Sequence, residues 1–121
     1  MKKLLLSTLI IFLSLTVISQ SCLPEGITFT TQSQIDSFQI MYPNCTEIEG
    51  DVYIGSSPSQ DINNLDSLNT ITRIDGGLYI SNTDSLVDLT GLENLWHIGE
   101  NLYIYFPQQS GSSNTALTSL Q

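Results

Sequence analysis

Basic residues are scarce in this sequence, and most of them lie at its start. Lys2 and Lys3 precede an apolar run, and Arg73 is the only other strong base. If an N-terminal segment holding both lysines is removed, one base remains against 12 acidic residues, hence a net charge of −11. Such a chain repels the phosphates of nucleic acids and anionic membrane surfaces, so we expect neither as a partner.

Residues that hold metals or carry out catalysis are also few. His97 is the only histidine, and Cys22 and Cys45 stand too far apart in sequence to suggest a metal site. The acidic residues are scattered singly, with no pair set apart for glycoside hydrolysis and no calcium-loop spacing. Gly76 and Gly77 lack the lysine and the following helix of a phosphate loop. We therefore expect a protein without cofactor, metal or enzymatic activity.

Residues 1–21 have the pattern of a secretory signal peptide. Two lysines precede an apolar run from Leu4 to Ile18, and small residues follow it. Cleavage after Ser19 and cleavage after Ser21 both fit this pattern. The second would leave Cys22 at the new N-terminus, and the alternative of a lipoprotein acylated at Cys22 stays open. An uncleaved membrane anchor is disfavoured, because the run is short for a membrane span.

The exported chain begins with a predicted cap, residues 22–47. An even number of cysteines in an oxidising compartment predicts a disulfide between Cys22 and Cys45, worth roughly 3 kcal/mol for a loop of this length. Between them a helix is expected over about residues 31–42. Thr31 and Gln34 fit a capping box, and an apolar stripe follows, before Pro43 ends the helix. The stripe consists of Ile35, Phe38 and Met41 or Tyr42.

From residue 48 onward the chain repeats itself. The segment Ile-Glu-Gly-Asp-Val-Tyr-Ile at 48–54 returns in altered form at 74–80 and 98–104. At the end of each copy, apolar residues alternate with polar or aromatic residues. This alternation predicts short strands with one buried face. The glycines before these strands, where the chain must turn a corner, are expected to use positive φ. They are Gly50, Gly76, Gly77 and Gly99.

A second block places an apolar residue at every third position. Leu65-x-x-Leu68-x-x-Ile71-x-x-Ile74 recurs at residues 89–98, and a third copy begins with Leu117-x-x-Leu120. Turn-forming residues fill the gaps, so a coil around a narrow core fits better than a long helix. The expected repeats are about 48–73, 74–97 and an incomplete 98–121.

This order of cysteine, helix, cysteine and repeats resembles a receptor L domain, the ligand-binding module of the epidermal growth factor and insulin receptors. It also looks like the leucine-rich repeats of bacterial secreted surface proteins. The resemblance implies a mainly β, right-handed parallel β-solenoid with an N-terminal, disulfide-tied cap helix. It also assigns the cap disulfide to Cys22 and Cys45. A full L domain has more coils and a closing cap, so the chain is expected to be a fragment or a truncated product, part of a longer repeat array.

The expected function is extracellular or cell-surface recognition or adhesion, with an unknown protein or glycan as ligand. Tyr53, Tyr79 and Tyr103 lie between the inward residues of the strands, so they are predicted to form an outward ladder, extended by Tyr105. The ladder is either a ligand-facing surface or merely a stabilising stack. The alternatives are a structural spacer or stalk and, more remotely, a polysaccharide-active β-helix enzyme. No membrane span is expected in the exported chain.

Overall fold

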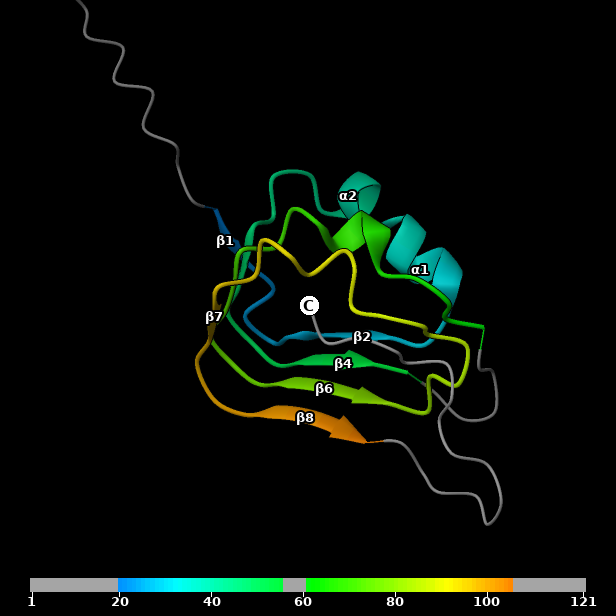
Figure 1. Cartoon of the computed structure of the whole chain (residues 1–121). Coiled ribbons are helices and arrows are strands. Elements are labelled where there is room, and N and C mark those ends of the chain that lie inside the picture. The colour runs from blue at the N-terminus through cyan, green and yellow to red at the C-terminus, as the bar shows by residue number, and fades with distance from the viewer. Residues whose placement is uncertain (1–19, 56–60, 106–121) are drawn as a thin grey trace, which may run out of the picture.

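The computed structural model describes residues 20–55 and 61–105. The predicted signal segment, part of the first loop and the third L-x-x-L copy lie outside these residues. Two four-stranded parallel sheets form two sides of the described chain (Figure 1). Sheet A consists of β1 (Ser21–Cys22), β3 (Glu47–Ile48), β5 (Arg73–Ile74) and β7 (His97–Ile98). Sheet B consists of β2 (Ile27–Phe29), β4 (Val52–Ile54), β6 (Leu78–Ser81) and β8 (Leu102–Tyr105). The prediction of a mainly β fold with parallel strands is confirmed.

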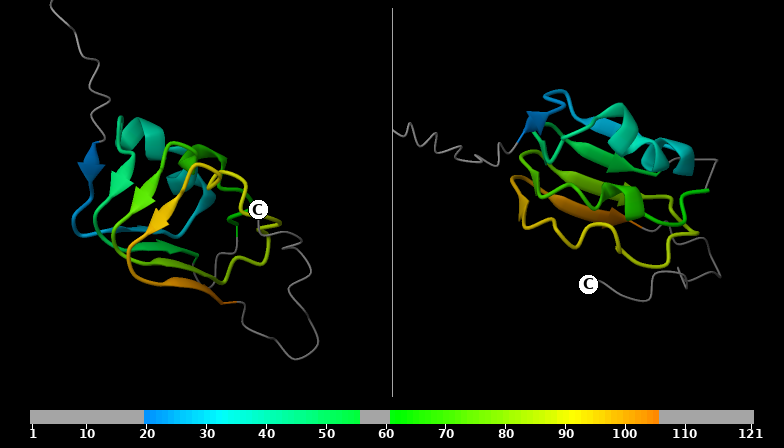
Figure 2. Two further views of the ribbon diagram at one scale, coloured as in Figure 1. Left: turned by 60° about the vertical axis from the view of Figure 1, so that its left-hand side comes forward. Right: turned by 90° about the horizontal axis from the view of Figure 1, so that it is seen from above.

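Each passage of the chain, here called a coil, gives one strand to sheet A and then one to sheet B. Figure 2 shows the strands of each sheet stacked side by side as two adjoining walls. The repeat offsets carry like residues onto like positions, so that Ile48 pairs with Ile74 and Ile54 pairs with Ile80. Because strand residues alternate between faces, these aliphatic rows point into the core.

The remaining side of the coils is helical or irregular (Figure 1). The first coil has α1 (Gln32–Asp36) and α2 (Phe38–Met41), and the second has a 3₁₀ helix, η1 (Asp66–Leu68). The predicted helix is therefore two short helices joined at Ser37. The capping box is confirmed, with Thr31 Oγ1 accepting from the backbone of Gln34, whose side chain accepts in return from Thr31 N.

The core lies between these three sides. Ile35 and Phe38 of the helices meet aliphatic side chains of both sheets, and Phe29 contacts Phe38 edge-on with ring centroids 5.7 Å apart. Of the two residues predicted to end the helical stripe, Met41 is 66% exposed and lies outside this core, whereas the Tyr42 ring contacts Phe38 with centroids 5.6 Å apart. The L-x-x-L residues of the second coil are fully buried, namely Leu65, Leu68, Ile71 and Ile74.

Gly50, Gly76, Gly77 and Gly99 do not have the positive φ that was expected. The glycines with positive φ among the described residues are Gly26, Gly55 and Gly91. A Cβ at Gly50 would collide with the backbone of Gly26, and one at Gly76 with the backbone and carboxylate of Asp51. Close approach of successive coils, and not left-handed backbone, therefore requires glycine at these two positions.

Strands β1 and β2 show that the first coil begins before the predicted repeats. Ile27-Thr28-Phe29 pairs in register with Val52-Tyr53-Ile54, and Ser21–Cys22 pairs with Glu47–Ile48. The region predicted as a cap thus adds a strand to each sheet as well as the two helices. This places Thr28 in line with the outward tyrosines of the next coils.

Candidate functional site

The outward residues of sheet B form a tyrosine ladder, defined here as Tyr53, Tyr79, Tyr103 and Tyr105. Tyr53 pairs with Tyr79, and Tyr79 pairs with Tyr103, across β4, β6 and β8. The first two rings are stacked, with centroids 4.7 Å apart and planes 11° from parallel. Tyr103 is tilted by 45° at 6.5 Å from Tyr79, and it lies 6.0 Å from the nearly parallel ring of Tyr105. The predicted alignment of tyrosines on one face is therefore present.

Exposure differs along the ladder. Tyr53, Tyr103 and Tyr105 are each about half exposed, at 43%, 51% and 47%. Tyr79 is more covered, because its ring lies against Gly77, where any Cβ would collide with the ring. Glycine two residues before Tyr79 thus lets the central ring lie down on the backbone. The ladder presents aromatic surface mainly at its two ends.

Asp51 connects the ladder to the corner that precedes it. Its Oδ1 accepts a hydrogen bond from Gly77 N at 2.8 Å, so it bridges the second and third coils. Tyr53 Oη donates to its Oδ2 at 3.4 Å, a long bond. Partial desolvation of the ring and the negative charge of Asp51, with smaller effects of Tyr79 and Glu100, raise the pKa of Tyr53 above its ordinary value. The phenol therefore stays neutral at physiological pH.

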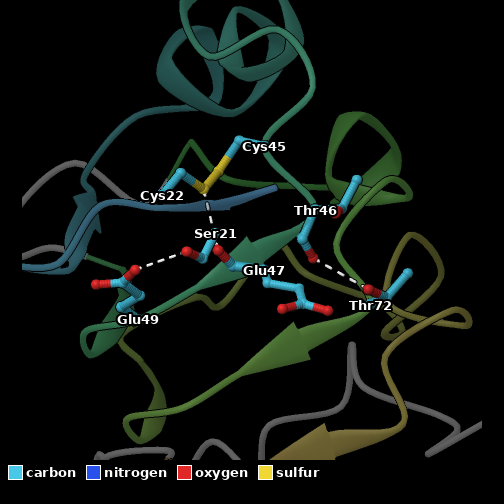
Figure 3. Close-up of a disulfide and its surroundings, with 7 residues drawn as sticks. All are labelled: Ser21, Cys22, Cys45, Thr46, Glu47, Glu49 and Thr72. Carbon is cyan, nitrogen blue, oxygen red and sulfur yellow. Dashed lines mark hydrogen bonds between the residues drawn. A yellow bond between two sulfur atoms is a disulfide. The ribbon is translucent and has the colours of Figure 1, made fainter. Parts of the chain in front are cut away.

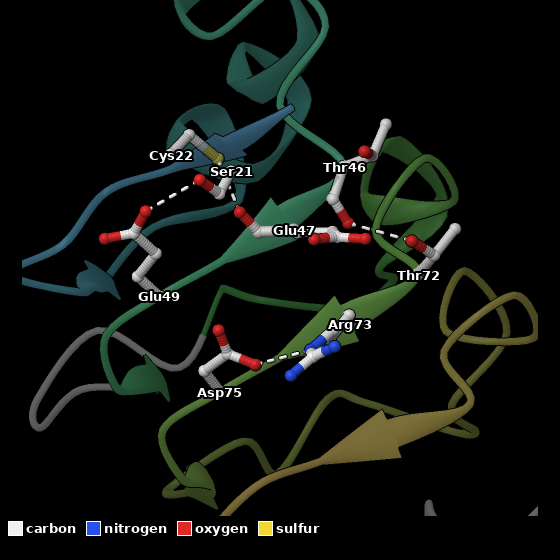
Figure 4. A network of polar contacts seen from close by, with 8 residues as sticks. All are labelled: Ser21, Cys22, Thr46, Glu47, Glu49, Thr72, Arg73 and Asp75. Atoms are coloured by element: carbon white, nitrogen blue, oxygen red, sulfur yellow. Dashed lines mark hydrogen bonds and ion pairs between the residues drawn. The ribbon is translucent and has the colours of Figure 1, made fainter. Parts of the chain in front are cut away.

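Sheet A carries a different outer surface. Figure 4 shows polar side chains along it, with Ser21 Oγ donating to Glu49 at 2.7 Å and Arg73 paired with Asp75. The next outward residue is His97, the strand partner of Arg73. Beside it Trp96 is 70% exposed, with ring centroids 5.5 Å apart. This surface is hydrophilic apart from the tryptophan.

The predicted disulfide between Cys22 and Cys45 is present at the start of sheet A (Figure 3). It joins β1 to the chain just before β3, with the two Cα atoms 5.7 Å apart. The Cys22 sulfur also lies 3.2 Å from the Glu47 carbonyl oxygen. This contact is not a hydrogen bond, because a disulfide sulfur carries no proton to donate. The bridge thus fixes the first strand of sheet A, whose pairing extends over only two residues.

A hollow of about 310 Å³ lies beside the free edge of β2. None of the described residues that line it is charged. Its walls come from β2, α1 and the end of α2, namely Ile27, Thr28, Phe29, Ser33, Gln34, Ser37, Met41 and Tyr42. The hollow therefore offers apolar contact and neutral hydrogen bonding, and no group suited to acid–base chemistry.

The described residues bring together no evident catalytic or metal-binding constellation. Within residues 20–55 and 61–105, no group of three or more His, Cys, Asp or Glu residues could hold a metal ion. His97 and Arg73 are neighbours in sheet A, whereas the tyrosine ladder belongs to sheet B. The sequence prediction missed Asp51 as a partner of the ladder, because its bond to Gly77 depends on the stacking of two coils.

Comparison with protein families agrees with this geometry. The sequence matches the receptor L domain family over residues 44–119, which is more than half of the chain. The chain belongs to the receptor L domain family. Comparison with curated proteins and with solved structures gives no match. The match begins at Asn44 and spans the repeats that supply the tyrosine ladder.

Receptor L domains are ligand-binding extracellular modules. Membership of this family and the disulfide both point to an extracellular location. In the part of the chain that the structure describes, no helix is long and apolar enough to cross a membrane. Because the family binds ligands, exposed surfaces that could contact a ligand are of interest. Among the described residues, the tyrosine ladder is the surface richest in exposed aromatic side chains.

Proposed function

We propose that this L domain is a non-catalytic recognition or adhesion module that binds a protein or glycan through the outer face of sheet B. The observation that carries this proposal is the tyrosine ladder, half exposed at both ends. Tyrosine combines a large, fairly rigid apolar ring with a polar tip, and it is enriched in recognition surfaces. An aromatic row on a flat sheet suits the extended surface of a partner.

The proposed organisation follows the repeats. An N-terminal signal peptide is cut after Ser19 or Ser21, residues 22–47 are a cap that includes the helices, and residues 48–121 are the L-domain-like repeats. The chain winds as a right-handed solenoid at the cell surface or outside the cell. The disulfide, the helices at the first coil and the family match to residue 119 support this organisation.

Binding by variants of the exported protein tests the function. The wild-type chain is screened against immobilised glycans and purified extracellular proteins, and each hit is remeasured with Tyr103→Ser. The variant is expected to lose binding, because Tyr103 is exposed and its removal leaves the core intact. Trp96→Ser removes another exposed aromatic residue, away from sheet B, and should bind as the wild type does. Equal binding by wild type and Tyr103→Ser would place the ligand elsewhere.

A purely structural role has one observation in its favour. The stacked pair Tyr53–Tyr79 stabilises adjacent coils without any ligand. If the domain is only a spacer, no hit from the screen will depend on the ladder, and Tyr79→Ser will lower stability alone. The exposed ends of the ladder favour recognition over this alternative, because a stack needs no exposed ring surface.

A further inference from the structure

The charges around the tyrosine ladder are all of one sign. Glu25, Asp51 and Glu100 stand one or two residues before β2, β4 and β8, along the edge where these strands begin. Of these, Glu25 and Glu100 are exposed and Asp51 is half-buried. These three residues are called the acidic rim. In the described residues, sheet B contains no basic side chain.

The few basic groups of the chain lie elsewhere. Arg73 and His97 are both on sheet A, and Arg73 is already paired with Asp75. The remaining two bases, Lys2 and Lys3, belong to the predicted signal peptide. Nothing on sheet B therefore neutralises the rim or attracts an anionic partner.

The tyrosine rings add to the negative electrostatic potential of the acidic rim. The face of an aromatic ring is its electron-rich side, and it attracts a lysine or arginine head within about 6 Å of the centroid. Tyr53 and Tyr79 are too close together, at 4.7 Å, to admit a group between them. A bound cation must therefore lie on the outside, over the exposed rings of Tyr53, Tyr103 or Tyr105.

We propose that the partner of the tyrosine ladder is a positively charged protein segment, whose lysine or arginine side chains lie over the rings while the acidic rim attracts them. The inference rests on the proposed function of this face and narrows its ligand from protein or glycan to a basic protein surface. Charge complementarity carries it, since the Asp51 carboxylate contacts Tyr53 at the start of β4 and sheet B has no base among the described residues.

The probe is a short oligo-arginine peptide amide, compared with the same peptide made with citrulline, which keeps the shape and loses the charge. Binding to the exported protein is measured by fluorescence anisotropy at low and at physiological salt. The arginine peptide should bind at least about tenfold more tightly than the citrulline peptide at low salt, and its affinity should fall as salt rises. Equal affinity of the two peptides would overturn the proposal.

Matched variants distinguish binding at the tyrosine ladder from general electrostatic attraction to an acidic protein. Glu100→Gln on the rim and Glu47→Gln on sheet A each remove one exposed or half-buried charge, so they change net charge equally. Glu100→Gln should weaken binding more. Tyr103→Leu should weaken it about two- to fivefold, whereas Tyr103→Phe keeps the ring and should bind nearly as the wild type does. Equal effects of the two glutamine variants, or no effect of Tyr103→Leu, would show diffuse attraction and contradict the proposal.

The failure of this inference can be told from failure of the proposed function. If an uncharged oligosaccharide binds, resists salt and is lost in Tyr103→Leu, the ladder is a recognition face and the basic partner is wrong. If neither the peptide nor any hit of the screen depends on Tyr103, both proposals fall.

Discussion

The two sheets of this domain share their interior and differ in their outer surfaces. Inward, sheet A repeats isoleucine at Ile48, Ile74 and Ile98, and sheet B repeats it at Ile54, Ile80 and Ile104. Outward, the successive residues of sheet A are all different, whereas sheet B places tyrosine at three consecutive positions. These outward rows are Ser21, Glu47, Arg73 and His97 on sheet A, and Thr28, Tyr53, Tyr79 and Tyr103 on sheet B.

This difference distinguishes the residues that each coil needs for packing from those that serve only its outer surface. Burial demands an apolar side chain at the inward positions, because every coil packs on the same narrow core. No such demand acts on the outward rows, and sheet A shows that varied polar residues are tolerated there. The regular tyrosines of sheet B therefore reflect either contact between neighbouring rings or a ligand, and the following experiments weigh the two sheets against each other.

The largest effect is expected inside, where the sheets should behave alike. Ile74 of sheet A and Ile80 of sheet B are both at most 1% exposed. Ile74→Ala and Ile80→Ala should each lower the free energy of unfolding by about 2–5 kcal/mol, through lost burial and the cavity left behind. Urea unfolding of both variants measures this. A much smaller effect at one site would show that the two inward rows are not one core.

Loss of the disulfide comes next and should distinguish the sheets. Replacing Cys22 and Cys45 by alanine is expected to lower stability by roughly 3 kcal/mol, because the bridge restricts the unfolded chain. The folded state should loosen first at β1, since it pairs over two residues whereas β2 pairs over three and contributes the buried Phe29. Hydrogen exchange of the double variant tests this. Equal loss of protection at β1 and β2 would contradict it.

These two comparisons use features that the sequence predicts well. Alternation of apolar residues predicts β4, β6 and β8, and the equal spacing of their tyrosines predicts the ladder. Periodicity carries this information because each coil must place the same residue at the same depth. The cysteines could be paired because only two are present in the chain.

Other features depend on contacts between coils, and local pattern does not reveal them. Ile27-Thr28-Phe29 shares only a short alternation of apolar residues with the later strands, and it forms β2 because β4 offers it a pairing edge. Only the neighbouring coil reveals why Gly50 and Gly76 are required: there is no space for a Cβ, whereas their φ is not positive. The bond from Gly77 to Asp51 likewise joins residues 26 apart. Each of these required the three-dimensional stack.

The tyrosine row should contribute a moderate amount of stability. Tyr79 stacks on Tyr53 and lies against Gly77, so Tyr79→Ser is expected to lower the free energy of unfolding by about 1 kcal/mol. Tyr103→Ser should have a smaller effect, because its ring is tilted and half exposed. Chemical denaturation of both variants compares them. Equal losses would mean that stacking extends over the whole ladder, which would strengthen the structural role.

The acidic rim should be visible in the titration of Tyr53. The pKa of Tyr53 is raised, so the neutral phenol is favoured in the folded state. Its contribution to stability is fully present below about pH 10, the unfolded pKa, and is lost as pH rises through the higher folded pKa. Asp51→Asn should move the pKa of Tyr53 back towards its ordinary value, whereas Glu47→Gln on sheet A should not. Tyrosinate absorbance measured against pH, with Tyr53→Phe to assign the signal, would show the shift, and an unchanged Tyr53 titration in Asp51→Asn would contradict it.

The smallest effect is expected on the outer face of sheet A. Arg73 and Asp75 form an ion pair whose side chains are 38% and 41% exposed, so water and salt screen their attraction. A double-mutant cycle with Arg73→Gln and Asp75→Asn should give a coupling energy of about 0.2–1 kcal/mol that declines as salt is added. Unfolding curves at low and high salt supply the four free energies. A coupling well above about 1 kcal/mol that ignores salt would mean that the pair is shielded from water. Sheet A would then carry an organised polar network on its outer face. Its outer residues could no longer be contrasted with those of sheet B as unspecialised.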